Sequence, residues 1–177
     1  SDGAASRLGV KRNIGVAIAI PRPFADELEG WRDRFGDPAA HLIQAHVTLL
    51  PPTNVSDVAA VEQHLAGVAE RHGAFPIVLA GTGTFRPLSP VVYVRVASGG
   101  EQIGTLEADV RSGPLARSLR FPYHPHVTVA HDVPETMLTL AQDALASYHA
   151  TFTADCITLY EQEPSGHWGP LREFSLQ

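Results

Sequence analysis

The 177-residue chain is poor in cysteine and lysine, with Cys156 and Lys11 as the single residue of each type, and it has no long hydrophobic run. One cysteine argues against a disulfide framework or a four-cysteine zinc site and favours the reducing cytoplasm. The apolar stretch 16–20 is too short to cross a bilayer, so we expect no membrane contact. A net charge of −6 argues against a long basic track for duplex nucleic acid.

The positive charge that is present comes mainly from twelve arginines. Planar guanidinium groups suit phosphate and carboxylate, although we expect most of these arginines to be solvated. The composition therefore leaves room for a small phosphorylated substrate or a strand end, and the acidic charge favours the smaller of these. Nothing in the sequence demands more than a monomer.

Strand-like and helix-like segments alternate in both halves of the chain. Val- and Ile-rich runs predict strands, and apolar residues three and four apart predict helices. The break at 113–114 should end the third helix early. The predicted strands are 13–20, 45–50, 75–80, 91–97, the run containing 126–128, 152–162 and 171–176. The predicted helices are 24–35, 56–73 with Ser56 as its cap, 103–119 and 134–148.

The sequence His-Val-Thr occurs twice, at His46–Thr48 and at His126–Thr128, each time inside a short apolar run. From the His and Thr content, about half of one His-x-Thr sequence is expected by chance. Side chains alternate along a strand, so each copy places an imidazole and a hydroxyl on one face. The matching context of the two copies predicts two similar lobes that face each other.

We therefore predict an α+β, bilobal fold with mainly antiparallel sheets flanked by helices. One domain of two lobes covers residues 13–176. Residues 1–12 form an N-terminal extension, whose first residues are a cloning remnant or a frayed end.

Two such faces suit phosphodiester chemistry without a metal. An imidazole has an ordinary pKa near 6.5, so one histidine can act as a neutral base and the other as a protonated acid, and their repulsion helps to separate the charge states. We assign His126 as the base and His46 as the acid. Thr48 and Thr128 would donate hydrogen bonds to the non-bridging phosphoryl oxygens.

The paired motif resembles that of the 2H phosphoesterases, which include bacterial 2′-5′ RNA ligases and 2′,3′-cyclic nucleotide phosphodiesterases. Residues 83–85 with 91–94 are similar to the family's central strand pair, and 121–125 lead into the second motif in a similar way. The resemblance implies two pseudo-symmetric lobes around a central cleft and a catalytic set of His46, Thr48, His126 and Thr128. It also implies hydrolysis or end joining without a metal or other cofactor. On this resemblance the expected partner is a small phosphorylated nucleotide or an RNA terminus, and a 2′,3′-cyclic phosphate is the favoured substrate type. The sequence departs from many RNA-ligase-like members at His131, where those have an arginine.

Four further residues are candidate substrate contacts. Arg86 could clamp a terminal phosphate, and Phe85 and Tyr123 could stack on a base. His131 lines the mouth of the pocket or lies on the plain surface. Five histidines without a partner motif are expected to be solvated: His41, His64, His72, His149 and His167.

Three alternatives to hydrolysis stay open at this stage. The chain could join 2′-5′ RNA ends, or it could be an RNA-end or nucleotide-binding module that does little chemistry. A third alternative is a hydrolase whose metal is held by His124, His126 and His131 together with His46. The sequence does not distinguish a cyclic mononucleotide from an RNA terminus as the substrate.

Overall fold

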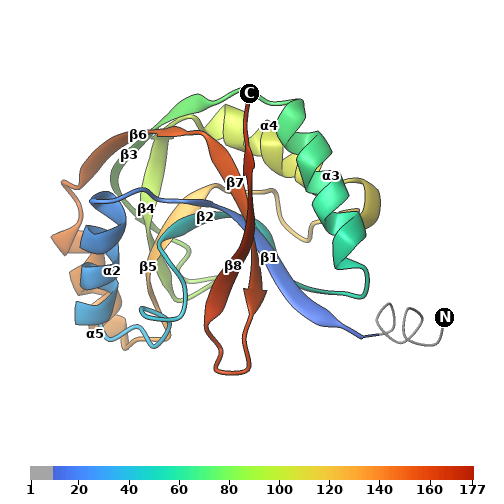
Figure 1. Ribbon diagram of the computed structural model, residues 1–177. Coiled ribbons are helices and arrows are strands. Elements are labelled where there is room, and N and C mark those ends of the chain that lie inside the picture. The colour runs from blue at the N-terminus through green and yellow to red at the C-terminus, as the bar shows by residue number, and fades with distance from the viewer. Residues whose placement is uncertain (1–9) are drawn as a thin grey trace.

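Two four-stranded antiparallel sheets form the frame of the computed structural model, which describes residues 10–177 (Figure 1). The first sheet has the strand order β2-β1-β7-β8 and the second has the order β5-β4-β3-β6. The first sheet contains β1 (Arg12–Ala19), β2 (His46–Val55), β7 (Cys156–Gln162) and β8 (Trp168–Ser175). The second contains β3 (Phe75–Thr84), β4 (Val91–Ser98), β5 (His126–His131) and β6 (His149–Ala154). The predicted α+β, bilobal fold with antiparallel sheets is confirmed.

Helices cover the two sheets in pairs, and the pairs lie on opposite sides of the molecule (Figure 1). Both α2 and α5 contact β5, and α3 contacts α4 as well as β7 and β8. The helix bounds are α2 (Phe24–Arg34), α3 (Val58–Glu70), α4 (Gly100–Val110) and α5 (Glu135–Ala144), together with a short 3₁₀ turn (Gly113–Leu115). Because α2 comes from the first half of the chain but packs on the second sheet, the two lobes interlock.

The core is one continuous cluster of buried apolar side chains that spans both lobes. On β1, the alternate residues Ile14, Val16 and Ile18 point into this cluster and are at most 1% exposed. The other face of β1 carries the small residues Gly15 and Ala17. This division follows the two-residue repeat of a strand, and the small side chains leave a shallow surface on the face that points away from the core.

Among the predicted elements, three differences from the structure concern the first motif strand, a helix cap and the return from one lobe to the other. The first motif strand continues through Pro51 and Pro52 to Val55, because β2 is an edge strand, where a missing N–H is tolerated. Helix α3 is capped by Asp57, whose carboxylate accepts from the Ala60 N–H, and not by Ser56. The predicted strand 152–162 is divided into β6 and β7, which belong to different sheets. The connection from β6 to β7 carries the chain from the second lobe back to the first.

The predicted extension, residues 1–12, lies mostly outside the described residues. Within 10–177, no helix has both the length and the apolar character that crossing a membrane requires.

Candidate active site

Both His-Val-Thr segments lie on edge strands, β2 of the first sheet and β5 of the second. These two edges contact each other, so the fold brings the two motifs to one place between the lobes. On each strand the central valine is fully buried, at 0% exposure for both Val47 and Val127. The histidine and threonine on either side of each valine are half-buried on the opposite face. The structure thus places His46, Thr48, His126 and Thr128 as the alternation predicts.

The two imidazoles are held in the same way. The Nδ1 of His46 donates to the carbonyl oxygen of Gln44 at 2.7 Å, and the Nδ1 of His126 donates to that of His124 at 2.6 Å. A carbonyl oxygen can only accept, so the proton of each neutral ring lies on Nδ1 and the lone pair lies on Nε2. Each histidine therefore offers Nε2 for proton transfer.

The surroundings of the two imidazoles lower both of their pKa values. The pKa of His46 is lowered to about 4, mainly by burial and in smaller part by the positive charges of Arg32 and His126, against the opposing bond to Gln44. Burial also lowers the pKa of His126, with a smaller contribution from His124. In the free protein both imidazoles are therefore mainly neutral at neutral pH.

His126 lies in a cluster of aromatic rings. The Phe85 ring meets it edge-on with centroids 4.9 Å apart, and the Tyr93 ring lies 5.3 Å away. Phe85 and Tyr93 are themselves 4.6 Å apart. Gly83 makes room for this packing, because a Cβ there would come within 2.6 Å of the Tyr93 ring. The sequence did not identify Tyr93 as a site residue, because Tyr93 lies in a strand of apolar residues. Its neighbour on the next strand, Thr128, is known only once the strand register is known.

His46 has a different environment, a pocket of about 150 Å³ on the first sheet. The small residues Gly15 and Ala17 of β1 line this pocket together with the aromatic side chains of Tyr160 and Trp168. A Cβ at Gly15 would lie 3.7 Å from the Trp168 ring. No sequence pattern pointed to these residues, because they come together only when β7 and β8 return to the first sheet.

A larger cleft of about 700 Å³ lies on the His126 side and also reaches Thr48. Phe85 and Tyr123, two of the predicted substrate contacts, are among the residues that line it. The Tyr123 hydroxyl donates to the carbonyl oxygen of Thr48 at 2.6 Å. Burial raises the pKa of this phenol, so it stays protonated and keeps its donor. Tyr123 therefore ties the segment before the second motif to the strand that carries the first.

Arg86 does not take the predicted position of a phosphate clamp. Its guanidinium donates to Glu135 at 2.6 Å, Thr139 at 3.2 Å and Gln142 at 2.7 Å, all on α5. It is not among the residues that line the cleft. The acceptors on α5 were not visible from the sequence, because they lie about 50 residues further along the chain.

His131 is likewise not among the lining residues of the cleft. Its side chain is 44% exposed and lies 3.7 Å from the Asp132 carboxylate. Its backbone N–H donates to the buried Asp37 at 2.9 Å. The surface alternative for His131 is the one that the structure favours.

Asp37 belongs to a buried ion pair that links the segment after α2 to β5. Its carboxylate accepts from the Arg32 Nε at 2.7 Å, from the Ala39 N–H at 2.8 Å, and from the His131 N–H at the end of β5. Arg32 and Asp37 are 9% and 5% exposed. The pair thus holds the segment that follows α2 against the end of β5, and the charge of Arg32 also acts on His46.

The metal alternative finds no ligand set in the part of the chain that the structure describes. No three His, Cys, Asp or Glu side chains are arranged there to hold an ion. The rings of His124 and His126 are 5.7 Å apart, whereas His131 pairs with Asp132.

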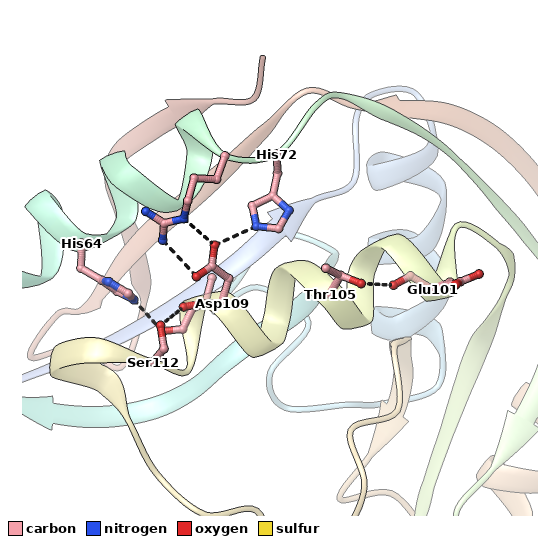
Figure 2. A network of polar contacts seen from close by, with 8 residues as sticks. His64, His72, Glu101, Thr105, Asp109 and Ser112 are labelled. Atoms are coloured by element: carbon pink, nitrogen blue, oxygen red, sulfur yellow. Dashed lines mark hydrogen bonds and ion pairs between the residues drawn. The ribbon is translucent and has the colours of Figure 1, made fainter.

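A second polar cluster lies between α3 and α4 (Figure 2). Asp109 accepts two bonds from Arg71, at 3.0 and 3.1 Å, and one from His72 at 2.8 Å. His64 bonds the carbonyl oxygen of Val110 at 3.0 Å. His64 and His72 were expected to be solvated, but each is partly buried as a tie between the two helices. Because these partners satisfy one another, the cluster has the character of a structural contact.

Comparisons with known proteins agree with the geometry. The family model described as the 2′-5′ RNA ligase superfamily matches residues 20–166. Two curated proteins named "Putative phosphoesterase", from Geobacillus sp. strain WCH70 and from Geobacillus kaustophilus, are each 27% identical over 164 residues, which is 90% of this chain and 94% of theirs.

Solved structures are similar in fold at lower identity. E. coli LigT complexed with 3′-AMP superposes with a TM-score of 0.69 at 22% identity, covering 95% of this chain and 99% of that one. LigT complexed with NADP⁺ gives 0.68 at 23% identity, with 94% and 99% covered. TT0787 of Thermus thermophilus gives 0.60 at 18% identity, with 93% and 97% covered. The predicted fold is thus found in proteins of known structure.

Proposed function

The chain belongs to the 2′-5′ RNA ligase superfamily, as its resemblance to the 2H phosphoesterases predicted, and from this premise we propose that it is a metal-independent phosphodiesterase. Its substrate is a 2′,3′-cyclic phosphate or a 2′-5′ phosphodiester of a nucleotide or RNA end. The observation that carries the proposal is the pairing of two His-Thr faces, each with its imidazole Nδ1 bonded to the carbonyl two residues before it. The nucleotide complexes of LigT support a nucleotide as the ligand.

In the proposed reaction His46 is the base and His126 is the acid, which reverses our sequence-based assignment. A phosphate anion between the rings raises the pKa of both imidazoles. His126 takes the proton, because the positive charge of the buried Arg32 opposes protonation of His46. The Nε2 of neutral His46 removes a proton from water as the oxygen attacks phosphorus. The Nε2–H of His126 protonates the ribose oxygen as its bond to phosphorus breaks.

The two threonines complete the site. In the described residues neither hydroxyl has a protein hydrogen-bond partner, and both are half-buried on the face of the imidazoles. Each can therefore donate to a non-bridging oxygen, where negative charge remains throughout the displacement.

The test is hydrolysis of a 2′,3′-cyclic nucleotide from about pH 5 to 9 with a chelator present. We expect a bell-shaped profile that is lost in His46→Ala and in His126→Ala, whereas the exposed His149→Ala control keeps it. Near-native turnover in both motif variants would refute the mechanism. Native protein that binds a 3′-phosphorylated nucleotide but gives no turnover at any pH would favour the binding-module alternative.

A further inference from the structure

The open side of the larger cleft carries exposed apolar side chains and arginines together. Leu88 is 88% exposed and Phe121 is 63% exposed. Both line the cleft that contains Thr48 and His126. Large apolar side chains that are exposed together beside a site indicate a binding surface, because exposure of apolar surface to water is unfavourable.

The charge of this rim contrasts with the acidic charge of the whole chain. Arg111, Arg117 and Arg120 line the cleft, and Glu107 is the one acidic residue among the described residues that line it. Glu107 is 2% exposed and is already bonded to the Arg111 Nε at 2.7 Å. The net charge of −6 therefore does not describe the surface beside the site.

Two of these arginines have no carboxylate partner in the described part of the chain. Arg117 has one long contact, from Nη1 to the Thr53 hydroxyl at 3.4 Å. Arg120 lies over the Phe121 ring, 5.4 Å from its centroid. Each keeps most of its guanidinium donors free, and a guanidinium binds a phosphate through two parallel bonds.

The loop that presents these side chains is held at both ends. Arg111 Nη1 donates to the carbonyl oxygen of Arg117 at 3.3 Å. At the other end the Tyr123 hydroxyl bonds Thr48. Residues 117–123 are thus positioned before any ligand arrives, which lowers the entropy cost of binding.

We infer that this rim, defined by Leu88, Arg117, Arg120 and Phe121, binds the nucleotides that precede the reacting phosphate, so that the preferred substrate is the end of a single RNA strand. The inference rests on the proposed function for the position of the reacting group. The guanidinium groups bind the preceding phosphates, and Phe121 stacks on a base. Two free arginines limit the footprint to a few nucleotides, which agrees with the absence of a longer basic track.

The first experiment compares kcat/KM for an RNA pentamer ending in a 2′,3′-cyclic phosphate with that for the cyclic mononucleotide. We expect a preference for the pentamer of about 10-fold or more, since stacking of one base is enough to give it. Arg117→Gln/Arg120→Gln and Phe121→Ser should each remove most of this preference. The matched control is Arg172→Gln, an arginine on β8 that also lies over a ring, 4.7 Å from the Phe174 centroid, and it should keep the preference. Equal kcat/KM for pentamer and mononucleotide in the native chain would overturn the inference.

A binding measurement separates this inference from the proposed function. Affinity for a 3′-phosphorylated RNA pentamer is followed by fluorescence anisotropy as salt is raised, where two neutralised phosphates give a slope of log K against log salt of about −1.4. The double arginine variant should bind more weakly and with a flatter slope. If neither substrate is turned over but this difference persists, the proposed function fails and the rim stands. If the double variant binds like the native chain, the rim fails whatever the turnover.

Discussion

His46 and His126 share a motif, a strand type and the bond from Nδ1 to a carbonyl, yet their surroundings differ. His46 faces a small pocket over Gly15 and Ala17, with the buried Arg32 close enough to lower its pKa. His126 is packed among aromatic rings beside a wide cleft. Equal motifs thus hold the two proton-transfer atoms in the same way, whereas the packing around the two rings differs, and in the proposed reaction this difference makes His46 the base and His126 the acid.

The strongest test of this comparison is the leaving group. His46→Ala and His126→Ala should each lower turnover of a cyclic nucleotide by about 10²- to 10⁴-fold, because each removes one proton transfer. With a phosphodiester whose leaving group is already acidic, such as a nitrophenol, no acid is needed. His126→Ala should then recover to within about 10-fold of native turnover, and His46→Ala should not. Recovery of His46→Ala instead would restore the assignment with His126 as the base.

Substitutions of the two threonines should lower catalysis equally, whereas substitutions of the two histidines should differ. Thr48→Val and Thr128→Val keep the shape of the side chain and remove one donor to the phosphoryl oxygen, so each should lower kcat by about 10²- to 10³-fold. Thr153→Val, at an exposed position of β6, is the matched control. Melting curves establish that the variants fold. A large loss in one threonine variant and none in the other would show that the phosphate lies against one face only.

The Arg32–Asp37 pair tests the origin of the difference between the two histidines. Asp37→Asn leaves a buried guanidinium without its counter-charge and should cost about 3 kcal/mol in urea unfolding, whereas Arg32→Met/Asp37→Asn removes both charges and should cost less. Loss of the Arg32 charge should also raise the His46 pKa from about 4 towards its ordinary value.

The pKa readout for this pair is the imidazole shift of each histidine, measured by NMR across pH. In the double variant the titration of His46 should move to higher pH and that of His126 should stay in place. Equal movement of both titrations would mean that Arg32 does not distinguish the two faces.

Local pattern predicted the fold and the four motif residues because both follow from periodicity along single strands. The His-Thr faces needed only the alternation of a strand, and the lobes needed only the repetition. Tyr93 and Trp168 could not be predicted, because their place at the site depends on strand register and on the return of β7 and β8 to the first sheet. Arg86 was misplaced for the same reason, since its acceptors on α5 are distant in sequence.

The smallest expected effect lies far from both motifs, at Asp109. Its bonds from Arg71 and His72 hold its pKa below the usual range, so the carboxylate is charged in the folded chain. Asp109→Asn should cost about 1–2 kcal/mol in urea unfolding at neutral pH, because two charge-assisted bonds are weakened at a partly exposed position.

A folded pKa below the unfolded value stabilises the chain above the unfolded pKa, and this contribution is lost as the pH falls through the folded pKa. The difference in stability between native and variant should therefore shrink in acid, while the kcat/KM and pH profile of the folded variant remain native. A changed pH profile would mean that the tie between α3 and α4 sets the relation between the two motif faces, which would place the origin of their difference outside the packing around each histidine.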